Sequence, residues 1–175
     1  ISMWKLLAHP LCVGFFVMRF LTDPVNYFFN FWIPEYLSHS RGFSLALIGM
    51  VAWIPFFASD LGGPGGGAVS DFLVNRGVSP WLARRKVMLV AAVAMPVAGA
   101  VTLVSQAWLS VALLALASAA QSCWMANQLA LISESVPQNE VGRVVALSAL
   151  GGSIGGILST VLAGNVIATY GYRPV

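Results

Sequence analysis

The sequence GAVSDFLVNRGVSPWLARRK (Gly67–Lys86) separates two apolar runs, each of which is long enough to cross a lipid bilayer. Four of the chain's nine Lys and Arg residues lie close together within it, namely Arg76, Arg84, Arg85 and Lys86. Short loops rich in Lys and Arg stay on the cytoplasmic side of a membrane. The stretch therefore predicts a cytoplasmic connection between two spans, and it sets the orientation of both.

The composition of the chain indicates an all-α integral membrane protein. Of its 175 residues 58% are hydrophobic and 9% are charged, whereas soluble domains contain about 25% charged residues. The net charge of +3 is explained by basic residues at span ends, so we expect no nucleic-acid partner. Cys12 and Cys123 both lie inside apolar runs, and their spacing predicts neither a disulfide nor a metal site. No cofactor is expected.

Five stretches have the length of about 20 residues that an apolar bilayer core of ~30 Å requires. The predicted spans cover about residues 11–36, 46–69, 87–105, 109–133 and 144–168. Residues 1–10 are too short to cross and are expected to form a cytoplasmic lead-in along the membrane surface. Lys and Arg residues gather in alternate connections, as the positive-inside rule requires. The chain is therefore predicted to start inside and to end outside.

The first predicted span carries an unusual stripe of polar side chains. Its members recur every three or four residues and are Arg19, Asp23, Asn26, Tyr27 and Asn30. On a helix with 3.6 residues per turn such residues share one face. Polar groups facing lipid cost roughly 2.5 kcal/mol or more when charged, so this face is expected to meet other helices or water.

Two uses of this stripe are open. Arg19 and Asp23 stand at i and i+4, so they either form a structural ion pair or take part in proton coupling. Asn26, Tyr27 and Asn30 supply donors and acceptors suited to a polyhydroxylated ligand, although Asn30 could equally bond a neighbouring helix.

An isolated acid, Asp60, lies near the centre of the second predicted span. An ionisable residue at this depth is by default a candidate functional residue. Dehydration favours the protonated form of a carboxyl group, which is what a proton carrier needs. The alternative is a permanent pair with a basic group elsewhere in the protein.

The fourth predicted span places Gln121, Trp124 and Gln128 on one helical face, with Asn127 three residues beyond Trp124. An indole flanked by amides offers a flat apolar surface together with hydrogen bonds, a combination suited to sugar-like ligands. Hydrogen bonding between helices is the alternative use of each amide. In the fifth span, the glycine-rich stretch Gly151–Gly156 predicts a face for close helix packing.

Several stretches resemble the hexuronate transporter group within the anion:cation symporter family of the major facilitator superfamily. They are FLTDPVNYFFNFWIPEYL (Phe20–Leu37), RGFSLALIGMVAWIPFFASDLGG (Arg41–Gly63), the basic stretch described above, and SVPQNEVGRVVALSALGGSIGG (Ser135–Gly156). The resemblance covers nearly the whole chain and corresponds to the seventh to eleventh helices of a twelve-helix protein. It implies five transmembrane helices of an incomplete six-helix half, without the first half and the final helix. A chain that opens on Ile1 agrees with a piece of a longer polypeptide.

The resemblance implies a multi-pass carrier of the bacterial inner membrane, not an enzyme, that takes up an organic anion with protons by alternating access. Its contacts to sugar hydroxyls would map to Asn26, Tyr27, Asn30, Gln121, Trp124 and Asn127. Its gating loop would map to Gly67, Asp71, Arg76, Arg84 and Arg85. In that loop Asp71 would cap a helix end or pair with basic groups, and so act as a conformational latch.

Two alternatives belong to other functional classes. A membrane sensor on the same fold would bind ligand without transporting it. An intramembrane aspartyl protease would use Asp23 and Asp60, because paired acids can share a proton and activate water. Asp60 is followed by Leu-Gly-Gly, which is not the motif that such proteases present.

Overall fold

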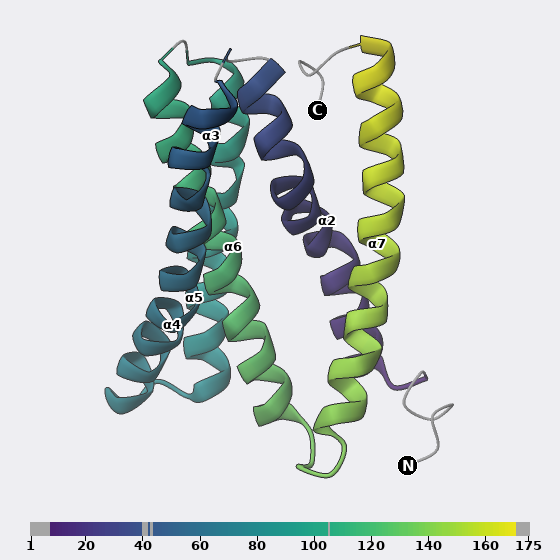
Figure 1. Ribbon diagram of the computed structural model, residues 1–175. Coiled ribbons are helices and arrows are strands. Elements are labelled where there is room, and N and C mark those ends of the chain that lie inside the picture. Colours follow the sequence, from purple (N-terminus) through teal and green to yellow (C-terminus); the bar gives the residue numbers. More distant parts are fainter. Residues whose placement is uncertain (1–7, 40–41, 43, 105, 171–175) are drawn as a thin grey trace. The chain divides into compact units, whose positions relative to one another are not determined.

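The computed structural model describes residues 8–39, 42, 44–104 and 106–170, and all regular structure within them is helical. The α-helices are α2 (Pro10–His39), α3 (Leu45–Val51), α4 (Trp53–Asn75), α5 (Pro80–Ala94), α6 (Ala107–Ser135) and α7 (Val141–Tyr170). A 3₁₀ helix, η1 (Met95–Thr102), continues α5 (Figure 1). The predicted all-α fold is confirmed.

Three helical stretches in the described part of the chain are long and apolar enough to cross a membrane. They are Ala46–Asn75, Trp108–Ser135 and Val141–Tyr170. The helices run beyond the spans predicted at 109–133 and 144–168, because a helix can continue past the apolar core into the polar surface layer. The spans predicted at 11–36 and 87–105 correspond to α2 and to α5 with η1, and their membrane crossing stays a prediction.

Two prolines explain where the second and third predicted spans change geometry. The second consists of α3 and α4, because Pro55 has no N–H to donate to the carbonyl of Val51, where α3 ends. Ser44 caps α3: its hydroxyl accepts a hydrogen bond from the Leu47 backbone N–H at 3.2 Å. In the third span, Pro96 lies at the start of η1 and ends the α-helical pattern of α5.

The basic stretch Gly67–Lys86 differs from its prediction as a connecting loop, since most of it is helical. The α-helix α4 continues to Asn75, α5 begins at Pro80, and only four residues lie between them. Gly77 adopts φ +88°, a conformation that L side chains rarely tolerate, so it makes the turn. Pro80 suits the first position of a helix, where no N–H is required. Glycine and proline set the turn here, whereas the charged residues continue the helices.

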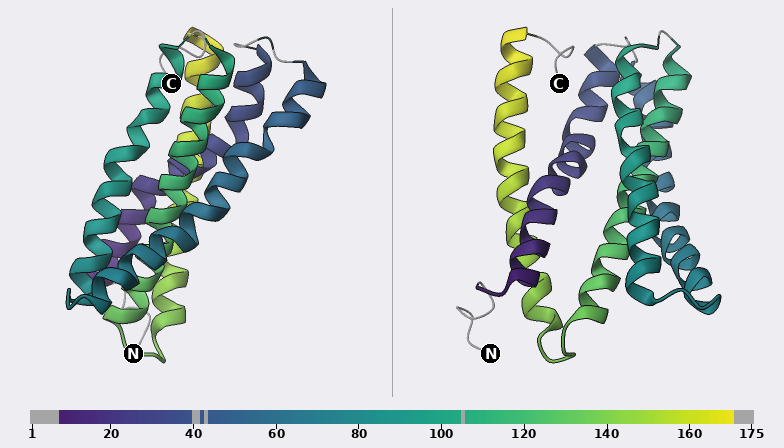
Figure 2. Two further views of the ribbon diagram at one scale, coloured as in Figure 1. Left: turned by 90° about the vertical axis from the view of Figure 1, so that its left-hand side faces the viewer. Right: turned by 180° about the vertical axis from the view of Figure 1, so that it is seen from behind.

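The described residues form two compact units, which we treat separately. The first contains the residues of α2 up to Phe31 together with the chain from Ile132 onward, including α7. The second contains Trp32–Leu131 and therefore α3, α4, α5, η1 and most of α6. Within the second unit, α4 and α5 form an antiparallel hairpin beside α6 (Figures 1 and 2).

Glycines allow α7 and α2 to approach closely in the first unit. A Cβ atom on Gly151 or Gly155 would meet backbone atoms of Phe16 or Phe20 on α2. One on Gly156 would meet the ring of Tyr27. The predicted packing face on α7 is therefore present, and its partner is the helix that carries the polar stripe.

A second glycine face lies on α4 and packs against α6. A Cβ atom on Gly62 would meet the backbone of Ala119, and one on Gly66 would meet the side chain of Cys123. Gly63 lies beside Ser122, whose hydroxyl would be 3.1 Å from an added Cβ. These contacts bring the polar residues of α6 within reach of α4.

Candidate functional site in the buried polar residues

Arg19 and Asp23 form an ion pair along α2. The Arg19 Nε and Nη2 atoms both donate to Asp23 Oδ2, at 2.9 Å and 2.7 Å respectively. The pair is largely withdrawn from solvent, with side-chain exposures of 15% for Arg19 and 4% for Asp23. Because a buried charge requires compensation, each residue supplies the counter-charge that the other needs.

The second carboxylate oxygen of Asp23 takes no part in these two hydrogen bonds. Asp23 Oδ1 is buried and has no hydrogen-bond partner among the described residues. The carboxylate lies against Gly152 of α7, where an added Cβ atom would collide with it. The ion pair therefore lies at the contact between α2 and α7. Both hydrogen bonds from Arg19 go to Asp23 Oδ2.

The three predicted ligand-binding residues of α2 differ in what the structure describes. Asn26 and Tyr27 are partly exposed, and the Tyr27 ring packs over Gly156. This contact with Gly156 fixes the orientation of the Tyr27 ring. Tyr27 remains on the same face of α2 as the other polar residues of the stripe. Asn30 belongs to α2, but its side chain lies outside the described residues.

Asn127 on α6 takes part in helix packing. Its side-chain Oδ1 accepts a hydrogen bond from the Ser70 hydroxyl of α4, and its Nδ2 donates to the Cys123 carbonyl at 2.9 Å. Asn127 and Ser70 are both fully buried. Sequence reasoning missed Ser70, although its spacing of four residues from Gly66 places it on the glycine face.

The other polar residues of α6 lie on a different face. Gln121 and Trp124 are buried, with exposures of 3% and 6%. Gln128 is fully buried, and neither its Oε1 nor its Nε2 has a hydrogen-bond partner among the described residues. One helix of membrane length therefore carries a buried amide at Gln121 and a buried indole at Trp124. A second buried amide, that of Gln128, follows one turn after Trp124.

Asp60 is exposed on α4, and it makes no ion pair with any described residue. It precedes Pro64 by four positions, so its own carbonyl receives no helical hydrogen bond from that residue. Asp60 and Asp23 belong to different units of the chain. No group of three His, Cys, Asp or Glu side chains in the described part could hold a metal ion.

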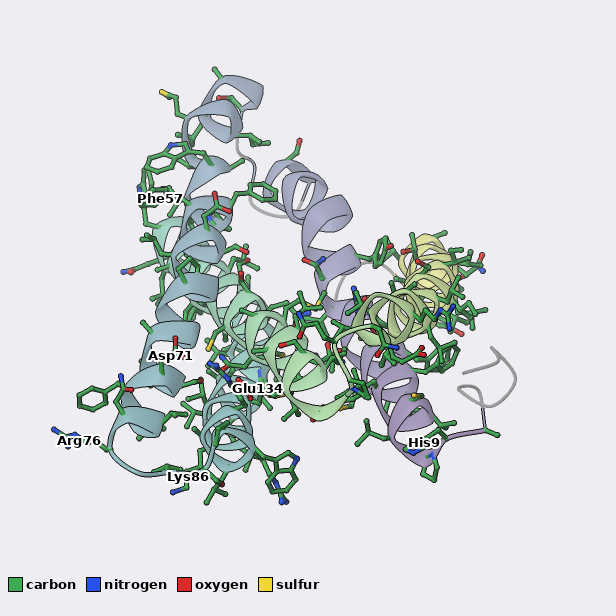
Figure 3. All side chains as sticks on the ribbon, turned by 90° about the horizontal axis from the view of Figure 1, so that it is seen from below. His9, Phe57, Asp71, Arg76, Lys86 and Glu134 are labelled. Carbon is green, nitrogen blue, oxygen red and sulfur yellow. The ribbon has the colours of Figure 1, made fainter. Side chains whose placement is uncertain are left out.

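An ion pair joins the two helices at the turn of the α4–α5 hairpin. Arg84 Nη2 lies 2.9 Å from Asp71 Oδ1, and the Asp71 side chain is 63% exposed. The guanidinium of Arg76 lies over the Phe72 ring at 4.4 Å, and that of Arg85 lies over Trp81 at 5.1 Å. Figure 3 shows Asp71, Arg76 and Lys86 at this end of the hairpin, with Arg76 directed away from the helices.

Of the predicted gating residues, the hairpin thus brings Asp71 and Arg84 together. The guanidinium groups of Arg76 and Arg85 instead lie over aromatic rings four residues earlier in the chain. Gly67 has open space around the position of a Cβ atom, so no close contact requires glycine there.

Comparison with known proteins identifies the family. The model of the Major Facilitator Superfamily matches residues 15–175. The chain belongs to the Major Facilitator Superfamily. Its all-α fold and its helices of membrane length are those of a membrane protein of this superfamily. Membership counts against the protease alternative, because relatives within the superfamily are named as transporters.

Curated relatives within the superfamily carry the names of sugar acid transporters. The chain is 28% identical to the probable galactarate/D-glucarate transporter GudP of Escherichia coli strain K12, over 95% of this chain and 37% of that protein. It is 26% identical to the D-galactonate transporter of Escherichia coli O6:H1, over 98% of this chain and 40% of that protein.

A third relative, the hexuronate transporter of Escherichia coli strain K12, is 27% identical over 99% of this chain and 40% of that protein. The chain therefore spans about two fifths of the length of these relatives. The resemblance to the major facilitator superfamily noted in the sequence is confirmed.

Proposed function

We propose that the chain is part of a secondary transporter that takes up six-carbon sugar acids, hexuronates among them, with protons across a bacterial inner membrane. The relatives are named for aldarates, an aldonate and hexuronates, which share a carboxylate and a row of hydroxyl groups. The observation that supports a ligand of this kind is the buried amide and indole of α6, at Gln121 and Trp124. Uncharged hydrogen-bonding groups beside an aromatic surface suit a polyhydroxylated chain.

The proposal assigns the substrate contacts to Asn26, Tyr27 and Asn30 on α2, and to Gln121 and Trp124 on α6. Asn127 receives a structural role instead. Its oxygen and one of its N–H groups are already bonded to α4 and α6, and a ligand would have to replace them. Exchange of a satisfied buried hydrogen bond for another gains little free energy.

Asp60 is the proposed site of proton coupling. It is the acid near the centre of a membrane-length stretch that makes no ion pair with a described residue. Asp23, in contrast, is already ion-paired with Arg19. We therefore expect Asp60→Asn to abolish uptake driven by a pH gradient and to retain exchange of labelled for unlabelled substrate.

Alternating access would involve an N-terminal half of the same polypeptide, as in the twelve-helix pattern that the sequence resembles. The ion pair between Asp71 and Arg84 would then act at the cytoplasmic end as a latch that biases one conformation. Such a pair shifts an equilibrium only if its energy differs between the two conformations.

The test is uptake of labelled acid by proteoliposomes that contain the complete polypeptide carrying this chain. Galacturonate, glucuronate, galactonate and galactarate are supplied in turn at two pH values, with sodium present or replaced by choline. Uptake of at least one of these acids, stimulated by an inward proton gradient and unaffected by choline, is expected. Binding without uptake would support a sensor, and dependence on sodium would contradict proton coupling.

A further inference from the structure

The fully buried amide of Gln128 has no described partner, and this sets it apart from its neighbour Asn127. Both residues have 0% exposure on α6. Asn127 is bonded to Ser70 and to the Cys123 carbonyl, whereas Gln128 Oε1 and Nε2 are both without a hydrogen bond in the described part of the chain. Adjacent amides with equal burial thus have opposite hydrogen-bonding states.

A buried primary amide without partners is unfavourable, because it has lost its bonds to water and gained none in return. Gln128 offers one acceptor oxygen and two donor hydrogens. A hydroxyl group of a ligand can satisfy both ends, since it donates to the oxygen of one amide and accepts from the nitrogen.

The helical register places Gln128 with the proposed substrate contacts. Positions 121, 124 and 128 are separated by three and four residues, so they lie along one face of α6. Position 127 is turned from position 128 by about 100° and belongs to the face that packs on α4. The orphan amide is therefore on the face of Gln121 and Trp124.

We propose that Gln128 is a specificity-determining substrate contact that hydrogen-bonds one hydroxyl group of the sugar acid. The proposal rests on the proposed function, since it presupposes a polyhydroxylated ligand. It adds that one particular hydroxyl is selected at this position. A site built to hydrogen-bond a hydroxyl group discriminates strongly against the analogue that lacks it, because the protein group is then left unpaired.

The experiment compares the parent polypeptide with Gln128→Met, which keeps an unbranched side chain of similar length and removes the amide. Affinities are measured by ligand-dependent protection against thermal unfolding, for the acid that is transported best and for its monodeoxy analogues. In the parent, one analogue is expected to bind about tenfold more weakly than the acid. In Gln128→Met the acid and that analogue are expected to bind with equal affinity, and the other analogues keep their rank order.

The unliganded protein provides the readout that separates a ligand contact from a structural one. If Gln128 bonds only to ligand, Gln128→Met leaves the unliganded Tm unchanged or raises it. The matched control is Asn127→Leu, which removes an amide whose partners belong to the protein. It is expected to lower the Tm and to leave the preference for the hydroxylated acid intact.

Each outcome decides the proposal. A lowered unliganded Tm in Gln128→Met, or an unchanged preference against every deoxy analogue, would overturn it and leave the proposed function standing. Failure of the parent to bind any of the four sugar acids would overturn the proposed function, and this inference with it. Should Gln128→Met fail to fold, Gln128→Asn shortens the amide by one methylene and is expected to reduce the same preference; no change in that variant contradicts the proposal.

Discussion

The α2–α7 contact of the first unit and the α4–α6 contact of the second use the same packing device around different polar groups. In both, glycines on one helix admit the other helix at close range. The first encloses a charged pair, Arg19 and Asp23, with one carboxylate oxygen left unbonded. The second encloses a neutral pair, Ser70 and Asn127.

The difference shows that close packing of two helices can enclose either an ion pair or a neutral hydrogen bond. A neutral hydrogen bond such as that between Ser70 and Asn127 strengthens the contact between two helices. A charged pair costs more to bury and is strongly coupled, so its loss or rearrangement has a larger effect. We therefore expect the α2–α7 contact to be the more sensitive of the two to substitution of its polar residues.

The largest expected effect follows from breaking the charged pair. Asp23→Leu leaves Arg19 largely buried without a counter-charge and is expected to lower stability by about 3 kcal/mol or more. Arg19→Met combined with Asp23→Leu should recover most of that loss, because no charge then remains. Thermal unfolding of the purified protein in detergent measures both. A double variant as unstable as Asp23→Leu would contradict the account.

Substitution of the glycines tests the feature that the two contacts share. Gly155→Ala and Gly62→Ala each direct a methyl group at the backbone of the facing helix and are expected to cost about 1–3 kcal/mol. Gly14→Ala and Gly65→Ala are matched controls in the same units, since nothing lies within 4 Å of an added Cβ. The controls should be neutral or stabilising, because alanine favours helix. Equal Tm values for test and control variants would refute close packing.

A smaller effect is expected from the neutral pair. Asn127→Leu removes the partner of Ser70 but leaves the Ser70 hydroxyl bonded to the Gly66 carbonyl at 3.1 Å. The expected loss is about 1 kcal/mol, in the range measured for hydrogen bonds between membrane helices. A fall in stability as large as that of Asp23→Leu would remove the contrast between the two contacts.

The smallest effect on stability is expected at the hairpin turn. Asp71→Asn breaks a pair whose acid is mostly exposed, so stability should change by less than about 1 kcal/mol. If the pair is a latch, however, the rate of exchange between conformations should rise while ligand affinity in a locked state stays the same. Arg84→Gln should reproduce the rate change. Stopped-flow fluorescence separates the rate from the affinity, and an equal loss of both would argue against a latch.

Much of the fold could be predicted because it depends on properties that are local in the sequence. The lengths of the apolar runs and the clustered Lys and Arg residues indicated membrane helices, and the Gly151–Gly156 stretch indicated a packing face. Pro55 and Pro96 are equally local signals, and they explain why two predicted spans change geometry. The turn at Gly77 could have been found in the same way, which would have shortened the predicted loop.

The candidate site was less predictable, because burial and partners depend on residues far away in the sequence. Asn127 and Gln128 are both amides in one apolar run, and the sequence gives no local reason to separate them. Their difference arises from Ser70, which reaches Asn127 across 57 positions once Gly62 and Gly66 admit α6. Likewise, the spacing of Arg19 and Asp23 allowed a pair, but only Gly152 on α7 shows why the pair is buried.

By itself, the sequence determined that this protein is helical, lies in a membrane and carries polar residues on particular helical faces. These properties follow from composition and from periods of three to four residues, which a single helix already expresses. Only the tertiary structure decided which of those residues are satisfied and which are not. A hydrogen bond requires a second group within about 3 Å, and folding alone brings that group from another helix.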